Sequence, residues 1–318
     1  MYSFRPQAGH IAAVDVGPHR VRVALADLSG GIVGWLDEPT GDDAVGPERM
    51  VGVQRAIDRC LNGSGLRTPD LVGIGVAVTG MVGHDGRLIV SRNLPDWEGV
   101  DIAGRLGRIY GCPVAVENDI RMAALAEHRL GAARLADDVV YLLAGHRVSM
   151  ALILGGELRH GHHSAAGEIG GIAFSMAVDP RHDQLTWRSA PSGEEVFRLA
   201  ANGDADSLDE VRQFATGLST GIAIAAMTVD PDLIVVGGGL SSAGGVLLDP
   251  LRDAVNAAIP VPAHPTIIAS ELGAEAVTLG TLVHAFGIAS TSLYGCEGLP
   301  EPTIDVPSAR SIAREAAA

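Results

Sequence analysis

The chain has 318 residues, enough for two domains, and its 47% hydrophobic against 19% charged content excludes a disordered protein. A net charge of −15 at pH 7 opposes contact with phosphate backbones, so DNA binding by this chain alone is not expected. Its 3 cysteines form no CxxC pair, and neither a signal peptide nor a bilayer-length apolar run is present. We therefore predict a cytoplasmic protein that does not contact a membrane.

The first part of the chain is typical of strands followed by a helix. His10–Val16, Val21–Leu28 and Ile32–Leu36 are apolar runs separated by glycine turns, which are short enough to make consecutive strands antiparallel. A helix is predicted over Pro47–Leu61. Leu71–Val78 is a continuous apolar strand of the kind that is buried on both faces.

A polar corner follows the next predicted strand. The chain alternates apolar residues after Cys112, then reads Glu117-Asn118-Asp119, then continues at helical spacing. A carboxylate at such a corner lies where α/β sheets bind their ligands. Asp119 could accept a proton from a bound hydroxyl while Asn118 orients the ligand. Either residue could instead only cap the helix that begins near Ile120.

The same plan begins again after Asp138. Val139–Leu143 and Val148–Leu154 are predicted strands separated by a glycine turn, and Leu233–Val236 is a strand that runs into three glycines. Helices are predicted over residues 193–201, 207–229, 247–259 and 277–289. This duplication predicts an α/β protein with two similar lobes and a ligand cleft between them.

Several motifs carry a family likeness: SRNLPDW at Ser91–Trp97, END at Glu117–Asp119, AGEIG at Ala166–Gly170 and DPDLIVVGGG at Asp230–Gly239. In this order they resemble the ROK family (repressor, open reading frame, kinase), from about Gly9 to Ala289. The resemblance implies the two-lobed actin/hexokinase-like fold, a duplicated ribonuclease H-like fold with a central cleft. We predict an N-terminal lobe over residues 1–119, completed by the helix near 277–289, a C-terminal lobe over 120–290 and a tail over 291–318.

The resemblance also implies roles for individual residues. An aspartate matching Asp119 is the base that deprotonates a sugar hydroxyl in the family kinases, and residues matching Asn93, Asn118 and Glu168 hold sugar hydroxyls. Carboxylates and amides pair well with the donor and acceptor hydroxyls of a sugar. Glu168 could alternatively be a turn residue in a glycine-rich segment.

The loops that cradle nucleotide phosphates depart from the family pattern. The kinase loop Asp-x-Gly-Gly-Thr-Lys is replaced by DVGPHR, in which Pro18 lacks an N–H donor, and Gly-Thr-Gly-Ile-Gly is replaced by GHRVS, with His146 and Arg147. These basic side chains could bind phosphate or obstruct a nucleotide. The nucleotide-contacting candidates that remain by position are Asp15, Gly17, Gly145, Gly238 and Gly239.

Two further departures concern metal and charge. The family usually has a histidine and a cysteine cluster for structural zinc after the AGEIG motif, whereas this chain has Gly171 and no nearby cysteine, so no zinc or other metal site is predicted. Arg121 stands where the family commonly has an asparagine. It could lower the pKa of Asp119 or simply point to solvent.

Altered phosphate loops beside preserved sugar motifs favour a sugar-binding protein, the effector domain of a transcriptional regulator. The alternative is an ATP-dependent hexose or N-acetylhexosamine kinase, which would also need magnesium. The resemblance implies a homodimer or homotetramer. Residues before His10 leave no room for the family's helix-turn-helix, so DNA contact would require an upstream domain.

Overall fold

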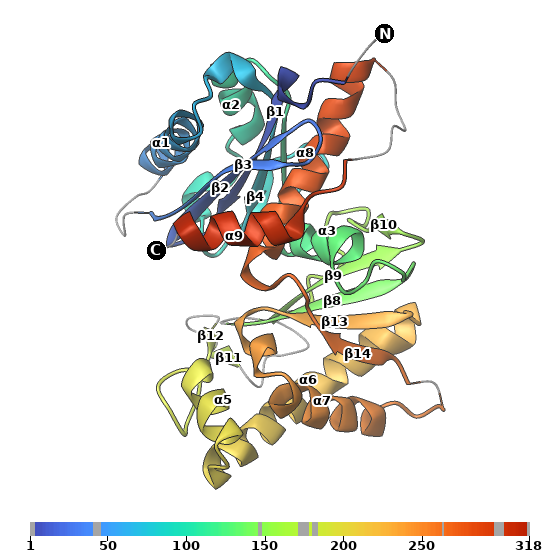
Figure 1. The fold of residues 1–318 in the computed structure, drawn as a ribbon. Coiled ribbons are helices and arrows are strands. Elements are labelled where there is room, and N and C mark those ends of the chain that lie inside the picture. Colours follow the sequence, from blue (N-terminus) through green and yellow to red (C-terminus); the bar gives the residue numbers. More distant parts are fainter. Residues whose placement is uncertain are drawn as a thin grey trace. The chain divides into compact units, whose positions relative to one another are not determined.

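The computed structural model describes residues 4–40, 46–145, 148–170, 178–179, 184–262, 264–295 and 302–316. It divides into two compact units (Figure 1), Met1–Leu130 with Glu275–Ala318 as unit 1 and Gly131–Ala274 as unit 2. Each unit is an α/β layer structure built on its own sheet.

The sheet of unit 1 has the strand order β3-β2-β1-β4-β7. Strands β1 (His10–Val16), β2 (Arg20–Asp27) and β3 (Ile32–Pro39) are antiparallel neighbours, and β4 (Leu71–Val78) and β7 (Val114–Asn118) continue parallel to β1. A short hairpin, β5 (Met81–Val82) with β6 (Leu88–Val90), follows β4. The predicted antiparallel opening and the buried strand at Leu71–Val78 are both confirmed.

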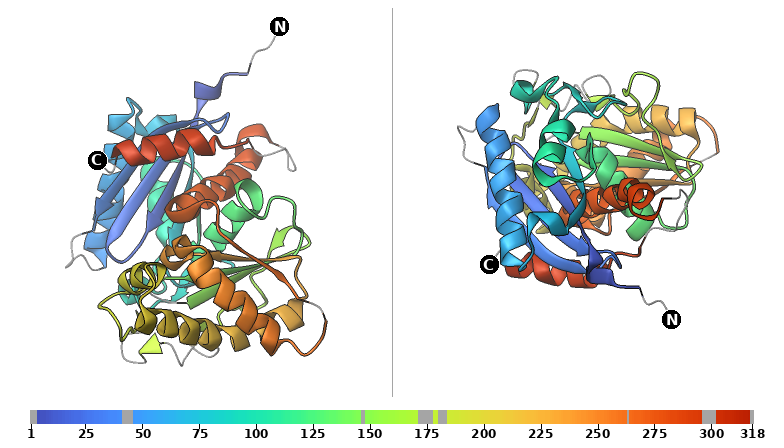
Figure 2. Two further views of the ribbon diagram at one scale, coloured as in Figure 1. Left: turned by 60° about the horizontal axis from the view of Figure 1, so that its bottom comes forward. Right: turned by 90° about the horizontal axis from the view of Figure 1, so that it is seen from above.

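Helices cover both faces of this sheet. Alternate residues of β1, including Ala12 and Val14, share a buried core with α1 (Pro47–Gly63) and α2 (Ile102–Tyr110). The helices α3 (Asp119–Leu130) and α8 (Ala276–Tyr294) pack together, and α8 lies against β1 and β4. The C-terminal α9 (Val306–Ala316) packs against β3 (Figure 2).

The packing of α3 explains where unit 1 ends. A Cβ atom built on Gly280 of α8 would lie 1.8 Å from the carbonyl oxygen of Met122 in α3, so only glycine allows these helix backbones to approach so closely. The division therefore falls after Leu130, whereas the sequence predicted it at Asp119, and α9 joins unit 1 where the sequence predicted a separate tail.

The sheet of unit 2 repeats the arrangement with the order β10-β9-β8-β13-β14. Its strands are β8 (Val139–Ala144), β9 (Val148–Leu154), β10 (Glu157–Leu158), β13 (Leu233–Gly237) and β14 (Thr266–Ala269). The first three pair antiparallel, and the last two continue parallel to β8. The duplication predicted from the glycine-separated strands is therefore confirmed.

Helices α5 (Gly193–Ala201), α6 (Ala205–Val229) and α7 (Gly245–Ala258) enclose the core of unit 2 against its sheet. A small pair, β11 (Val178–Asp179) with β12 (Gln184–Leu185), precedes α5. Short 3-10 turns complete the fold: η1 (Pro6–Ala8), η2 (Thr68–Asp70), η3 (Pro95–Trp97), η4 (Gly239–Ala243) and η5 (Gly273–Glu275).

Candidate functional site

The polar corner lies where two parallel strands of unit 1 end side by side. The register pairs Val78 at the end of β4 with Asn118 at the end of β7. Thr79 and Gly80 therefore leave the sheet beside Asp119, which begins α3. Carboxyl ends of parallel strands are the edge at which such sheets bind ligands.

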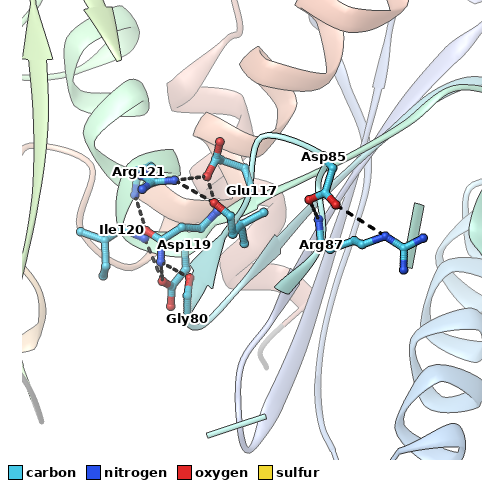
Figure 3. Close-up of polar contacts among 9 residues, drawn as sticks. Gly80, Asp85, Arg87, Glu117, Asp119, Ile120 and Arg121 are labelled. Carbon is cyan, nitrogen blue, oxygen red and sulfur yellow. Dashed lines mark hydrogen bonds and ion pairs between the residues drawn. The ribbon is translucent and has the colours of Figure 1, made fainter. Parts of the chain in front are cut away.

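The corner assigns the helix cap and the candidate base to different residues (Figure 3). The side-chain oxygen of Asn118 accepts the N–H of Arg121 at 3.0 Å, and its amide nitrogen donates to the Gly80 carbonyl at 2.7 Å. Asn118 is thus the cap. Asp119 is half-buried, and its Oδ2 accepts the Thr79 hydroxyl at 2.8 Å while Oδ1 accepts the N–H of Ile120 at 2.9 Å. A sugar contact by Asn118 stays a prediction.

Behind the corner lies a buried ion pair. The guanidinium of Arg121 donates to Oε1 of Glu117 at 3.0 Å, and the two side chains are only 3% and 7% exposed (Figure 3). Arg121 also donates to the carbonyl of Val82 at 3.4 Å. The alternative in which Arg121 points to solvent is therefore wrong, because its partners are inside unit 1.

The segment that carries Asn93 is tied to the end of β4. The Ser91 hydroxyl donates to the Thr79 carbonyl at 2.5 Å and accepts the N–H of Leu94 at 3.0 Å. Farther along, the Trp97 side chain is 1% exposed and its indole N–H donates to the Gly46 carbonyl at 3.1 Å. Asn93 is half-buried, and its segment and Asp119 both bond to Thr79.

Glu168 belongs to unit 2 and its side chain is exposed. Its backbone N–H donates to the Ala165 carbonyl at 3.1 Å, and the N–H of Ala166 donates to the His160 carbonyl at 3.0 Å, so it lies in a hydrogen-bonded turn. This agrees with the alternative stated from the sequence, in which Glu168 is a turn residue in a glycine-rich segment. Its participation in a sugar site with Asp119 stays a prediction.

The first phosphate-loop candidate is a closed hairpin turn in unit 1. The N–H of Gly17 donates to the Arg20 carbonyl at 2.9 Å, and the Pro18 carbonyl accepts the Thr40 hydroxyl at 3.2 Å. An N–H already used within the hairpin and a proline without one do not fit a backbone cradle for phosphate. Nucleotide contact by Gly17 stays a prediction.

Asp15 lies just before that turn and is ion-paired. Its Oδ2 accepts Arg22 at 3.2 Å, and Arg22 also contacts Asp37 at 3.1 Å across the neighbouring strand. Burial raises the pKa of Asp15, despite the opposing attraction of Arg22. Arg22 thus supplies positive charge at the carboxylate that the sequence assigned to the nucleotide site.

The remaining nucleotide candidates meet at one edge of unit 2. A Cβ atom on Gly238 would lie 2.4 Å from the Ala144 carbonyl, and one on Gly145 would lie 4.0 Å from the Gly239 nitrogen. Packing explains Gly238, whereas a Cβ on Gly239 would meet nothing within 4 Å. The structure brings Gly145, Gly238 and Gly239 together, and nucleotide contact by them stays a prediction.

Residues His146, Arg147 and Gly171 lie outside the described part of the chain. Within the residues that the structure describes, no group of three or more His, Cys, Asp or Glu side chains could hold a metal ion. The described cysteines, Cys60 and Cys112, are free thiols, and burial raises the pKa of Cys60 to about 12. Among the described helices, none combines the length and apolarity required to cross a bilayer.

Two residues of the corner were missed by sequence reasoning, Thr79 and the partner role of Glu117. The available signals were a polar residue directly after a buried parallel strand, and an acidic and a basic residue four positions apart. Both signals are common, so neither singles out a site without the pairing of β4 with β7.

The chain matches the ROK family over residues 11–184 and 171–286, and it belongs to this family. It is 28% identical over 273 residues to a glucokinase of Halalkalibacterium halodurans, covering 75% of this chain and 83% of that protein. It is 32% identical over 295 residues to the bifunctional enzyme NanE/NanK of Brucella melitensis, covering 85% of this chain and 52% of that protein.

Solved structures agree on the fold. A ROK family glucokinase from Streptomyces griseus, in complex with glucose and AMPPNP, superposes with a TM-score of 0.73 at 23% identity, covering 87% of this chain and 99% of that chain. A ROK family transcriptional regulator, a homologue of the E. coli MLC protein, gives 0.75 at 18% identity, covering 97% and 82%. The predicted actin/hexokinase-like fold is confirmed.

Proposed function

We propose that this protein binds a hexose or N-acetylhexosamine and phosphorylates one of its hydroxyls, with Asp119 as the general base. The observation that carries the proposal is the half-buried Asp119 carboxylate at the end of β7, whose two oxygens are both held by donors. The names of the relatives support phosphorylation over the sensing role that the sequence favoured.

The chemistry required of the corner is limited to binding and one proton transfer. A sugar hydroxyl that lies within hydrogen-bond distance of Asp119 gives up its proton as the oxygen attacks a phosphoryl group. Asn93 and Asn118, both from unit 1, are the amides that we assign to neighbouring hydroxyls. A sugar contact by Glu168 stays a prediction. Each polar contact discriminates against ligands that lack the matching hydroxyl.

A sugar-sensing effector domain is the second candidate, and the first phosphate loop favours it. The Gly17 N–H bonds within its own hairpin, Pro18 offers no N–H, and Asp15 is paired with Arg22. A protein that has replaced its phosphate cradle can keep sugar binding and lose turnover. Ligand would then act by stabilising one conformation over another.

A paired measurement separates these functions. The wild-type protein is given ATP, magnesium and each member of a panel of hexoses and amino sugars, ADP release is followed, and sugar binding is measured by calorimetry on the same preparation. Sugar-dependent ADP release is expected, with a loss of about 10²–10⁴-fold in Asp119→Asn. Asp206→Asn, an exposed aspartate of α6, is the matched control and keeps full activity.

The outcomes are distinct. If at least one sugar gives binding heat but none of them causes ADP release, the sensing function is supported and the kinase function is contradicted. Absence of both heat and turnover across the panel contradicts carbohydrate binding altogether. If Asp119→Asn still releases ADP at the wild-type rate, Asp119 is not the general base.

A further inference from the structure

Thr79 is the residue on which two parts of the candidate site converge. Its hydroxyl donates to Oδ2 of Asp119 at 2.8 Å, while its carbonyl accepts the hydroxyl of Ser91 at 2.5 Å. The two contacts use different atoms of one residue, at the point where β4 leaves the sheet. Neither the family motifs nor the predicted site residues include this threonine.

Ser91 fixes the segment that carries Asn93. Its hydroxyl oxygen accepts the N–H groups of Asn93 at 3.3 Å and Leu94 at 3.0 Å, and its own N–H donates to Glu98 at 2.8 Å. Ser91 is 5% exposed and Leu94 is fully buried, so this turn is part of the packed interior. A shift of the Asn93 segment would therefore pull on the Thr79 carbonyl.

The Asp119 end of the linkage is equally well defined. Asn118 and Gly80, the neighbours of Asp119 and Thr79, are joined by a hydrogen bond of 2.7 Å (Figure 3). The Ile120 N–H and the Asn118 amide donate to Oδ1 of Asp119 at 2.9 Å and 3.2 Å, and the Thr79 hydroxyl donates to Oδ2 at 2.8 Å. Donors on both oxygens restrict the orientation of the carboxylate, and the Thr79 hydroxyl is the donor at Oδ2 that comes from β4's end.

We propose that Thr79 is a positioning residue that orients the Asp119 carboxylate and couples it to the Asn93 segment. This inference rests on the proposed function for its catalytic consequence. In this arrangement a sugar that settles against Asn93 also meets a base whose oxygens already face a fixed direction. Such preorganisation is worth much in catalysis, since misplacement by about 1 Å can cost on the order of 10²-fold in rate.

The hydroxyl has a second, electrostatic effect. A donor that points at a carboxylate stabilises the ionised form over the protonated form. Removing it makes Asp119 take up a proton at a higher pH. A merely structural threonine would not show this effect, because loss of packing alone does not move the protonation of one particular carboxylate.

The matched variants are Thr79→Val and Thr79→Ser. Valine keeps the β-branched shape and removes the hydroxyl, whereas serine keeps the hydroxyl and removes the methyl group. The titration of Asp119 is followed by NMR on protein carrying 13C at the aspartate carboxyl carbon, with the resonance identified by its absence in Asp119→Asn. This measurement needs neither sugar nor turnover.

In Thr79→Val we expect the midpoint of the Asp119 titration to rise by on the order of one pH unit, and in Thr79→Ser to return to the wild-type value. With a sugar that is phosphorylated, kcat of Thr79→Val falls about tenfold, the acid limb of its kcat/KM profile moves to higher pH and KM changes less than kcat.

An unmoved midpoint in Thr79→Val, or a serine variant that behaves like valine, overturns the inference. If the Asp119 midpoint moves as expected but the protein phosphorylates no sugar, the kinase function is contradicted. The positioning role of Thr79 is then still supported. Thermal unfolding of each variant confirms that it is folded before either reading is taken.

Discussion

The two units build the same sheet and finish it differently. In unit 1 the order is β3-β2-β1-β4-β7 and in unit 2 it is β10-β9-β8-β13-β14, with antiparallel pairs at one side and parallel pairs at the other. β4 therefore corresponds to β13, and β7 corresponds to β14. The ends of these corresponding strands can be compared directly.

The ends of β4 and β7 in unit 1 are followed by polar side chains, whereas the end of β13 in unit 2 is followed by bare backbone. β4 is followed by Thr79 and β7 by Asp119, whereas β13 ends at Gly237 and continues through two more glycines. Side-chain oxygens suit a ligand that must be recognised hydroxyl by hydroxyl. Glycines instead leave room for a ligand to approach the main chain. The same sheet order thus ends in different chemistry after β4 and after β13.

Breaking the buried ion pair should have the largest effect on unit 1. Arg121→Ala leaves Glu117 buried without its guanidinium partner, and loss of one member of such a pair typically costs about 3–5 kcal/mol. Urea unfolding is expected to show this loss. The exposed Arg105→Ala on α2 is the control, with a change below about 0.5 kcal/mol.

The double variant Glu117→Gln with Arg121→Met refines this prediction. It removes both charges and should recover part of the stability, because no isolated charge remains buried. If Arg121→Ala unfolds at the same urea concentration as Arg105→Ala, the pair does not support the corner.

The glycine edge of unit 2 is tested by Gly238→Ala. Gly238 has a φ of +87°, and an added Cβ would lie 2.4 Å from the Ala144 carbonyl. Strain of this kind costs about 1–3 kcal/mol, so the variant should unfold at a lower temperature. Gly239→Ala is the matched control, since its Cβ would meet nothing within 4 Å. Equal unfolding temperatures would show that β13 does not need glycine at position 238.

The sequence predicted the strands and the motif residues of both edges, but it did not predict what Thr79 and Arg121 contact. Apolar periodicity identifies β4 and β7 one at a time. The contacts of Thr79 with Asp119 and of Arg121 with Val82 join residues about 40 positions apart, and they exist only because these strands pair in one register. Side-chain type alone left Arg121 ambiguous, because its burial depends on that pairing.

The unit boundary shows the same limit. Strand and helix lengths gave no sign that α3 belongs with α8, which follows it by about 150 residues in sequence. Their close approach depends on Gly280 meeting Met122, a contact between helices rather than a local pattern. The boundary predicted at Asp119 follows the local sequence motif, but it separates α3 from α8, which pack together in unit 1.

Glu210 offers a smaller, pH-dependent test in unit 2. Its carboxylate accepts the N–H groups of Arg188 at 2.6 Å and Ser189 at 2.8 Å, and the hydroxyl of Ser189 at 2.5 Å. Burial alone would raise its pKa, but these donors together lower it. A lowered folded pKa contributes stability above the unfolded value, near 4.3, and that stability is lost as pH falls through the folded pKa.

Glu210→Gln should therefore cost about 1–2 kcal/mol at pH 7 and less in acid, because the wild type loses its advantage there. Denaturant unfolding at pH 7 and at pH 3 measures the difference. A cost that is the same at both pH values would show that packing, and not the charge of Glu210, holds the Arg188–Ser189 segment.

The smallest effect on stability is expected for a substitution of Asp15. This prediction tests whether Asp15 contributes to folding at all. Burial raises the pKa of Asp15 even though Arg22 opposes the shift. The folded protein therefore binds this proton more tightly than the unfolded chain, so ionisation of Asp15 subtracts stability as pH rises through its folded pKa. Asp15→Asn removes that cost, and Arg22 keeps Asp37 as its partner. We expect a change within about 1 kcal/mol at pH 7 by denaturant unfolding.

Asp37→Asn provides the contrast, because hydrogen bonds from Arg20 and Arg22 outweigh burial and lower the pKa of Asp37, so its ionised form stabilises the hairpin. A clear loss of stability in Asp37→Asn beside none in Asp15→Asn would show that Asp15 is not kept for folding. The buried carboxylate of Asp15 would then serve the proposed phosphoryl transfer. In that case we expect sugar-dependent ADP release to fall in Asp15→Asn. A destabilisation in Asp15→Asn as large as that of Asp37→Asn would instead make Asp15 a structural partner of Arg22.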